Sequence, residues 1–585
     1  MALLGSYSGE LNLHRRQSFE RLRSQLDNER ASFKSHWRDL NDYILPRRGR
    51  FFVSDSNKGD RRNLKIIDST ATLSARTLRS GMMAGITSPS RPWFKLSTPD
   101  PKLNEFEPVK AWLHEVTRRM QNSFLKSNLY NVLPTVYGDI GTFGTGCMMM
   151  EEDFESVMRF YSFPIGSYMI ANDEKYQVRT FFREFRMTVR QIVDRFGRSV
   201  EKPGVIDWSN ISTKVKSLWD TENTEQWVDV NHVIRPNEKY DPRKAGSQYK
   251  RYSSTYYEQG VSGQSRQGYW GAGIEFDKFL SDKGYDYFPV LCPRWEVTGE
   301  DVYGTDCPGM SSLGDARQLQ TGERRSLQAI EKMINPPMVA PTSMKNSKAS
   351  ILPGDITYMD TRDGMQGFRP AHDIRFDISA LENKQDQVRN RIRRAYFEDL
   401  FLMLSQSDRR QITAREIDER HEEKLLALGP VLEQLNQDLL DPLIDNGFNI
   451  MEKQGAIPPP PEELQGTVLK VEYVSIMAQA QKLVGISGIE RFTNYVAGIA
   501  TIAPAILDKV NGDELVDSYA DITSIPPGIV RSDEAVGQIR ARQAEQVAQA
   551  QKLENMNKAA GTMKQLSETP IDGENALTAV AGGIS

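Results

Sequence analysis

The stretch DSTATLSARTLRSGMMAGITSPSRPWFKL, residues 68–96, is the most informative part of this chain for its fold. Asp68, Ser69 and Thr70 carry side-chain oxygens that can accept hydrogen bonds from the free amides of a first helical turn. Apolar side chains then recur at helical spacing, namely at Leu73, Leu78 and Met82. The pattern predicts a helix with its N-terminus near Asp68.

The end of this predicted helix is marked as clearly as its start. Gly81 and Gly85 loosen the last turns, and Pro89 and Pro92 prevent the helix from continuing. The aromatic pair at 93–94 follows directly. We therefore expect Trp93 and Phe94 to anchor the chain in a hydrophobic core.

Composition sets limits on the class of protein. The chain has 585 residues, of which 39% are hydrophobic and 26% charged, so we expect a globular protein of two to four domains. Its net charge of −4 gives no overall basic field for nucleic acid. Three scattered cysteines, Cys147, Cys292 and Cys307, do not suggest a disulfide framework. We find no signal peptide and no apolar run long enough to cross a bilayer, so we expect no stable membrane insertion.

The N-terminal part reads as helices followed by strands. One apolar stripe predicts a first helix that ends at Pro46, formed by Phe19, Leu22, Leu26, Phe33, Trp37, Leu40 and Ile44. We interpret the arginines at 47, 48 and 50 as a solvated or interface turn rather than a DNA contact. Helix is expected over 109–136 and 188–196, and strands over 158–185.

Residues 201–286 are polar and rich in Gly, Ser and Tyr, which favours a variable β-rich insertion. The segment QYKRYSSTYYEQ, residues 248–259, mixes basic and aromatic residues as nucleic-acid surfaces do. We favour an edge hairpin with exposed tyrosines instead.

The middle of the chain predicts a helix, a small β module and a second helix. The first helix, over 313–334, is ended by Asn335-Pro336-Pro337. Short strands and turns follow to about residue 377, and the second helix spans 379–404. Such a unit would be an antiparallel helix pair with a protruding tip.

The C-terminal part begins with a polar loop, SQSDRRQITA, at 405–414. A long helix with kinks at Pro430 and Pro442 is expected next, then an extended proline link at 458–461, the strand KVEYVS and further helices. We expect residues 566–585 to be disordered because they are small, polar and Gly-rich.

No pattern of catalytic or metal-binding residues is complete. The chain contains neither a GxxxxGK[ST] phosphate loop nor a GxSxG nucleophile elbow, and HEEKL at 421–425 lacks the second histidine of HExxH. Glu151, Glu152, Asp153 and Glu155 could be imagined as a two-metal nuclease site, although a charged turn is the better interpretation. We therefore expect no enzymatic activity, no cofactor and no metal.

Several motifs, in this order, resemble the head-to-tail connector, or portal, proteins of short-tailed, podovirus-type bacteriophages. Residues 68–96 resemble a stretch near the N-terminus of that family. The other matching motifs are HWRDLNDYILPRRGRF at 36–51, SNLYNVLPTVYGDIGTFGTGCMMMEED at 127–153, FPVLCPRWEVTGEDVYGTDCPGM at 288–310 and PPPPEELQGTVLKVEYVS at 458–475.

The resemblance implies a mixed α+β, predominantly helical subunit with the regions of a portal protein. The expected regions are a wing at 1–310, a first stem helix at 311–335, a clip at 336–378, a second stem helix at 379–404, a channel loop at 405–414, a long wing or crown helix at 415–457, a crown at 458–565 and a tail at 566–585.

The resemblance also implies a function and partners. Copies of the chain would form a ring, dodecameric in the family, at one capsid vertex, through which double-stranded DNA is packaged and ejected. The expected partners are the major capsid and scaffolding proteins, the terminase and the tail adaptor or nozzle proteins. The protein would be assembled in the host cytoplasm and end in the virion, at the head–tail junction. The alternatives are another virion ring, such as a tail adaptor, or a DNA-processing enzyme subunit.

Two sets of basic residues are candidates for these contacts. Arg409 and Arg410 in the polar loop, with Arg389 and Arg393 of the second stem helix, are candidates for DNA contact in the channel. For Arg389, Arg391, Arg393 and Arg394 the other reading is a solvated helix face with salt bridges between subunits. Lys345, Lys348 and Arg362 are candidates for docking the terminase or the tail at the clip.

Overall fold

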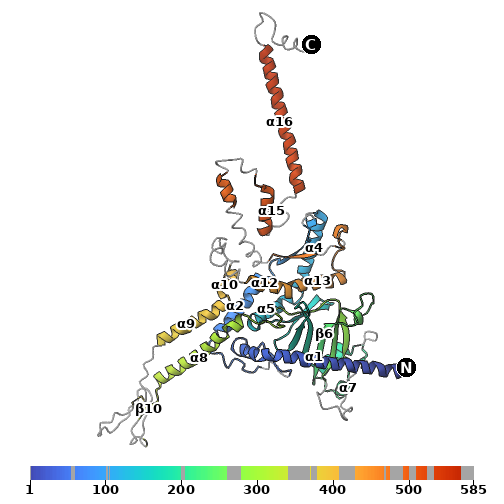
Figure 1. Ribbon diagram of the computed structural model, residues 1–585, viewed down its shortest axis with the longest axis vertical. Helices are drawn as coiled ribbons and strands as arrows, with labels where there is room; N and C mark the ends of the chain where they lie inside the picture. The colour runs from blue at the N-terminus through green and yellow to red at the C-terminus, as the bar shows by residue number, and fades with distance from the viewer. Residues whose placement is uncertain are drawn as a thin grey trace. The chain divides into compact units, whose positions relative to one another are not determined.

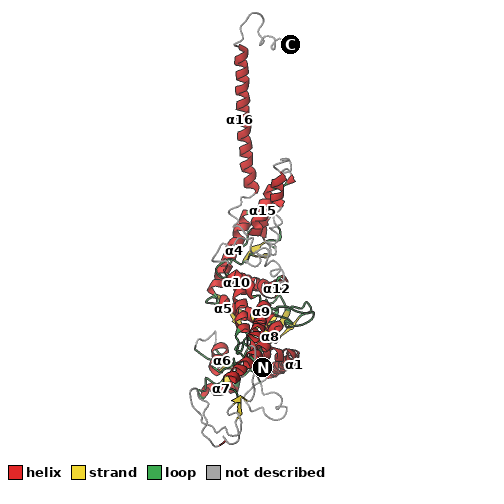
Figure 2. Ribbon diagram, turned by 90° about the vertical axis from the view of Figure 1, so that its left-hand side faces the viewer, coloured by secondary structure: helices red, strands yellow, loops and turns green. Residues whose placement is uncertain are grey.

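The computed structural model describes residues 2–53, 59–100, 103–104, 106–198, 204–259, 278–339, 345, 369–370, 378–406, 428–464, 466, 469–474, 492–499, 509–523 and 533–567. These fall into two compact units. The first unit comprises Met1–Asp100 and Pro108–Gln481, and the second comprises Pro101–Glu107 and Lys482–Ser585. Figures 1 and 2 show that helices make up much of the described chain, with strands gathered in the first unit, which matches the predicted mixed, mainly helical class.

The first unit is built around four N-terminal helices. They are α1 (Ala2–Tyr43), α2 (Thr70–Gly85), α4 (Glu107–Lys126) and α5 (Leu129–Phe143). The predicted stripe of α1 is correct, since Phe19, Trp37 and Leu40 are fully buried. Trp93 and Phe94 are buried as predicted, and Phe94 begins the short strand β1 (Phe94–Ser97). Leu73, by contrast, is 52% exposed, and α2 instead packs through small residues and through Leu78 and Met82.

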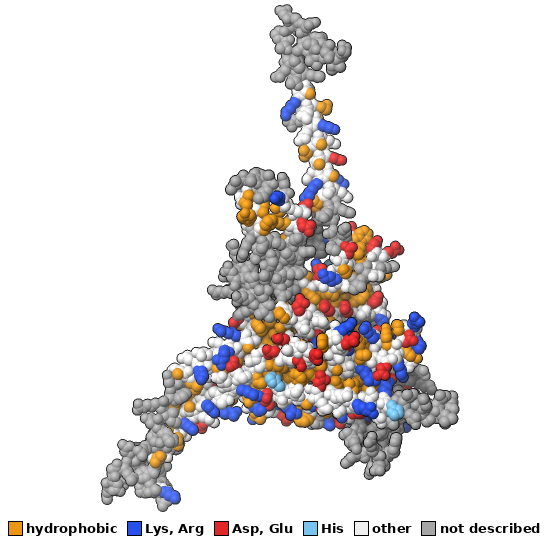
Figure 3. Space-filling model, in the orientation of Figure 1, with side chains coloured by type: hydrophobic (Ala, Val, Ile, Leu, Met, Phe, Trp, Pro, Cys, Tyr) orange, Lys and Arg blue, Asp and Glu red, His pale blue; other side chains and the backbone are white. Residues whose placement is uncertain are grey.

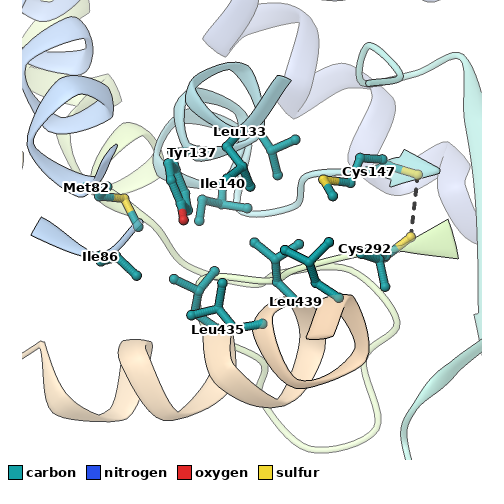
Figure 4. Close-up of a cluster of buried hydrophobic side chains, with 14 of the residues drawn as sticks. Met82, Ile86, Leu133, Tyr137, Ile140, Cys147, Cys292, Leu435 and Leu439 are labelled. Carbon is teal, nitrogen blue, oxygen red and sulfur yellow. Dashed lines mark hydrogen bonds between the residues drawn. The ribbon is translucent and has the colours of Figure 1, made fainter. Parts of the chain in front are cut away.

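The main hydrophobic core lies between α2, α5 and a helix from the C-terminal half of the unit. Figure 4 shows Met82 and Ile86, Leu133, Tyr137 and Ile140, and Leu435 and Leu439 converging from these segments. Gly141 lets α2 approach α5, because a Cβ at this position would lie 2.6 Å from Leu78 Cδ2. Gly141 therefore serves close packing between the two helices. Cys147 and Cys292 lie in the same core with their Sγ atoms 3.5 Å apart, and all three cysteines are free.

A five-stranded antiparallel sheet forms the second layer. Its order is β4-β5-β6-β7-β8, and its strands are β4 (Tyr168–Asn172), β5 (Val178–Thr188), β6 (Trp227–Pro236), β7 (Tyr252–Glu258) and β8 (Ser281–Tyr285). Phe19 and Leu26 of α1 pack on one face against Phe182 and Tyr257. On the other face, α6 (Val189–Phe196) and α7 (Thr213–Asp220) enclose a separate small core. Thr188 and Gln191 form the capping box of α6, which confirms the predicted start of that helix.

The prediction for residues 248–259 is wrong. β7 is an inner strand that pairs with both β6 and β8, and all seven of its residues are buried. Tyr252, Tyr256 and Tyr257 are no more than 7% exposed. The three tyrosines belong to three hydrophobic cores rather than to an exposed hairpin. The segment at 201–286 supplies three of the five strands of the sheet.

A smaller sheet joins distant parts of the chain. Its order is β3-β2-β9, formed by β3 (Val157–Ser162), β2 (Met148–Asp153) and β9 (Val290–Leu291). Arg48, predicted to lie in a solvated or interface turn, is instead tied to this region. Its guanidinium donates to Asp139 of α5 at 2.6 Å and to Ser162 Oγ at 2.7 Å. Arg47 and Arg50 are exposed.

Two long helices, α8 (Pro308–Ile334) and α9 (Ile378–Ala395), lie side by side, as Figure 1 shows. Cys307 caps α8, with Pro308 in its first turn, and the helix ends before Asn335-Pro336-Pro337 as predicted. The short strands β10 (Met338–Val339) and β11 (Arg369–Pro370) pair antiparallel at the far end. The paired helices and this strand pair agree with the predicted helix–β–helix unit, while most of the β module, at 340–344, 346–368 and 371–377, lies outside the described residues.

The second helix of that unit is shorter than predicted. α9 stops at Ala395, and α10 (Glu398–Gln406) begins after a break at Phe397, which has φ +52°. A phenylalanine in the left-handed region is unusual, and nothing in the apolar periodicity indicates it. Tyr396 and Leu400 continue the predicted apolar stripe across the break and are fully buried.

The remaining helices and strand of the first unit come from residues 428–474. α12 (Gly429–Leu435) passes through a π-helical turn, Asn436–Leu440, into α13 (Asp441–Lys453). Pro430 and Pro442 each lie in the first turn of a helix, where a missing amide costs little. The predicted strand is present as β12 (Lys470–Tyr473), which pairs antiparallel with β1. The rest of the long helix, from 415, lies outside the described residues.

The second unit contains two described helices with defined bounds. They are α15 (Gly512–Thr523) and α16 (Asp533–Ser567), joined by an ion pair in which Arg540 donates to Asp513 at 2.6 Å. Residues 568–585, for which we predict disorder, lie outside the described part of the chain.

Candidate functional site on the α8–α9 helix pair

The arginine cluster of α9 lies beside α8, and its members have different surroundings. Figure 3 shows basic side chains along this helix pair. Val388 and Ile392 point into the core and fix the rotation of α9. The four arginines therefore fall on different sides of the helix, as their spacing requires.

Arg389 is held by three carboxylates of its own chain. Its Nε donates to Asp68 at 2.8 Å, its Nη1 donates to Asp386 at 2.6 Å, and its Nη2 donates to Glu323 of α8. The hydrogen bond to Asp68 is the main reason that the pKa of Arg389 is raised. Arg389 thus joins α9 to α8 and to the start of α2.

Asp68 has two tasks in this network. Its Oδ1 accepts from the backbone amide of Thr70 at 2.7 Å, which confirms the capping role read from the sequence, while Ser69 makes no side-chain cap. Burial alone would raise the pKa of Asp68, but the hydrogen bonds from Thr70 and Arg389 outweigh it and lower that pKa.

The other arginines are more exposed. Arg391 pairs with Asp315 of α8 at 2.7 Å, within the same chain. Arg393 lies 3.9 Å from Glu398 and keeps 49% of its side chain exposed, and Arg394 is also exposed. The salt bridges seen for Arg389 and Arg391 are therefore within one subunit.

The remaining candidate residues are mostly outside the described part of the chain. Lys345 is described and exposed. Lys348, Arg362, Arg409 and Arg410 lie outside the described residues, as does the HEEKL segment at 421–425.

The base of the helix pair is anchored by a contact that sequence reasoning missed. A Cβ on Gly81 of α2 would lie 2.3 Å from the side chain of Phe401 of α10. Ser74, two turns earlier on α2, donates to Glu398 of α10 at 2.8 Å. Gly81 is thus a packing position rather than a loosened helix end. A small residue on the buried face of a helix was the only signal for it.

The acidic run at 151–155 lies partly on a strand and is used in ion pairs. Glu151 pairs with Arg195 at 3.4 Å, Glu152 with Lys453 at 2.7 Å and Asp153 with Arg159 at 3.9 Å. Adjacent carboxylates on β2 point to opposite faces, so they do not converge. Among the described residues, no group of three or more His, Cys, Asp or Glu side chains is arranged to hold a metal ion. Within the same residues, no helix is long and apolar enough to cross a membrane.

Comparison with known proteins assigns this architecture to a class. A sequence model of the family described as bacteriophage head to tail connecting protein matches residues 16–530, so the chain belongs to that family. It is 46% identical over 558 residues to the portal protein of Salmonella phage epsilon15, covering 95% of this chain and 96% of that protein. It is 42% identical over 561 residues to the probable portal protein of Bordetella phage BPP-1, covering 96% and 97%. The protein is a structural connector of the phage head–tail junction and not an enzyme.

Proposed function

We propose that this chain is the subunit of a phage portal, a ring at one capsid vertex through which double-stranded DNA enters the head and later leaves it. The observation that carries this proposal is the similarity to portal proteins over nearly the whole length of both chains. In the family the ring is dodecameric, and we propose the same here. The subunit would be assembled in the host cytoplasm with the capsid and scaffolding proteins.

We propose that the α8–α9 helix pair forms the stem region of each subunit in the ring. α8 and α9 would be its two stem helices, and the paired strands β10 and β11 would belong to the clip at its tip. The region at 1–310 would be the wing, the residues at 458–565 the crown, and the loop at 405–414 the part nearest the DNA. The break at Phe397 separates α9 from α10. Because α10 packs against α2, we propose that α9 belongs to the stem and α10 to the wing-side base of the stem.

We propose that DNA meets few basic side chains in the channel. Arg409 and Arg410 are the main candidates, with Arg393 as an exposed residue of α9. Arg389 is the weakest candidate, because three carboxylates already compensate its charge. A chain with a net charge of −4 suits a conduit, since every neutralised phosphate adds affinity and would slow the passage of DNA.

The clip would contact the partners that act in turn on the ring. We propose that Lys345, Lys348 and Arg362 dock first the terminase that packages DNA and then the tail adaptor or nozzle proteins. The exposure of Lys345 agrees with such a surface.

The test is native mass spectrometry on the purified protein, with negative-stain images of the same sample. We expect a closed ring of about a dozen subunits with a central hole. A monomer or dimer that persists across protein and salt concentrations would exclude the channel mechanism.

A further inference from the structure

The two sides of the α8–α9 pair differ in charge. A groove of about 640 Å³ on one side is lined by residues of both helices, among them Arg325 of α8 and Lys384 of α9. Its apolar floor includes Leu319, Leu381 and Val388. Among the described residues, Arg325 and Lys384 have no carboxylate within 4.0 Å, so their charges are available to a partner. We call this side the basic groove.

The opposite side of the pair is acidic and partly apolar. At about 100° per residue, Glu382 and Asp386 share one face of α9, and Glu323 and Leu327 share the corresponding face of α8. None of these four residues lines the groove. Leu327 is 56% exposed and Asp386 keeps 63% of its side chain exposed. We call this side the acidic face. Arg389 compensates only part of its charge, because Glu382 lies outside that network.

The two sides also match in height. Gln385 Nε2 donates to Ser326 Oγ at 2.8 Å, so Lys384 and Arg325 lie at one level along the helix pair. Asp386 and Leu327 directly follow Gln385 and Ser326 in the sequence, so they lie at nearly the same level on the other side. A closed ring has no rise along its axis, so a feature on one side of a subunit meets the neighbour at a similar height.

We propose that the acidic face of one subunit docks into the basic groove of the next, with Leu327 covering the groove's apolar floor. This inference rests on the proposed ring and names the surfaces that close it. The two sides are different and complementary, which is what a head-to-tail interface between identical copies requires. Opposite charges would also disfavour a two-fold dimer through either side, because that contact would bring like charges together.

The test is a charge exchange in the full-length protein. Arg325→Glu and Glu382→Lys should each place like charges across the interface, and their combination in one chain should restore opposite charges. The matched control is Arg324→Glu, since Arg324 is the exposed neighbour of Arg325, lies about 100° away from it around α8 and undergoes the same charge change. Ring content would be measured by mass photometry across protein concentration, at about 0.1 M salt and at about 1 M salt.

We expect each single reversal to raise the concentration needed for half-assembly by about tenfold or more, less so at high salt, and the combined variant to recover most of the loss. Thermal unfolding of the dissociated subunits should be unchanged, which separates assembly from folding. Equal behaviour of Arg325→Glu and Arg324→Glu, or no recovery in the combined variant, would overturn the interface. If the single variants form normal rings that fail to retain DNA, the groove faces the channel, and the proposed interface is overturned as well. If the unaltered protein forms no ring, the proposed function itself fails.

Discussion

Gly81 allows α2 and α10 to pack closely because it has no side chain. Adding a methyl group here would bring Cβ to 2.3 Å from Phe401, so α10 would have to move. We expect Gly81→Ala to destabilise the protein by about 1–3 kcal/mol through overpacking. The control is Gly314→Ala in α8, where nothing lies within 4 Å and the change should instead stabilise the helix by up to about 1 kcal/mol. Thermal unfolding would compare them, and a stabilised Gly81→Ala variant would contradict the packing role.

Asp68 gives stability that depends on pH. Its folded-state pKa is lowered, so the folded chain binds this proton less tightly than the unfolded chain does. Its contribution is therefore complete above about pH 4, the ordinary range for aspartate, and is lost as the pH falls through the folded-state pKa.

We expect Asp68→Asn to cost about 1–2 kcal/mol at neutral pH, because the amide cannot pair with Arg389 as a charge. The difference from the unaltered protein should shrink under acid conditions. Urea unfolding at pH 7 and near pH 3 would measure it, with the exposed Asp220→Asn as control. A difference that stays constant across this range would argue against the ionised hydrogen bonds.

At the scale of elements, a buried ion pair joins the π-helical turn to the segment that follows β9. Arg294 Nε donates to Asp438 at 2.8 Å, and the two side chains are only 3% and 8% exposed. Removing one partner leaves a buried charge, so we expect Asp438→Asn to destabilise the protein by about 3–5 kcal/mol. The comparison is Glu225→Gln, which breaks the exposed pair with Arg190 and should change little. Similar melting temperatures for both variants would show that the buried pair contributes no more to the stability of the fold than the exposed pair does.

The elements that the sequence predicts well are those with a local signal. Pro46 and the 335–337 segment end helices as expected, and Thr188 begins one, because caps and prolines act within a turn of their own position. The missed features depend on distant residues. Phe397 adopts a left-handed conformation between Tyr396 and Leu400, which are both fully buried. The side chains of β7 are buried because hydrophobic cores from other parts of the chain cover them.

The same distinction applies to the candidate site. The arginines of α9 could be found from composition, but their partners could not. Asp68 and Glu323 reach Arg389 from positions 321 and 66 residues away, and only the packing of α2, α8 and α9 brings them together. A cluster for which DNA contact and a solvated face with salt bridges were both predicted is thus divided between ion pairs within the chain and exposed side chains.

At the scale of the whole molecule, the proposed channel must let DNA pass and then keep it in the head. A near-neutral subunit limits attraction along the path, so a few basic side chains per subunit, repeated around a ring, would supply the retention. Arg409 and Arg410 are the residues that we propose for this task. Their effect should be strongly salt-dependent, because it acts through phosphate charge.

We expect Arg409→Ala with Arg410→Ala to leave ring assembly unchanged and to lower the yield of DNA-filled heads by about tenfold, with partial recovery when both are Lys. The control removes two exposed arginines near the two ends of α6, as Arg190→Ala with Arg198→Ala. Complementation of a portal-deficient phage would measure infectious yield, and nuclease treatment of the isolated heads would measure retained DNA at low and high salt. Lysine keeps the charge and loses the planar guanidinium. The yield of DNA-filled heads that the double lysine variant recovers therefore measures attraction to phosphate, and the part not recovered measures a specific arginine contact. Full DNA retention by the alanine variant would remove these residues from the channel and leave the exposed Arg393 of α9 as the next candidate.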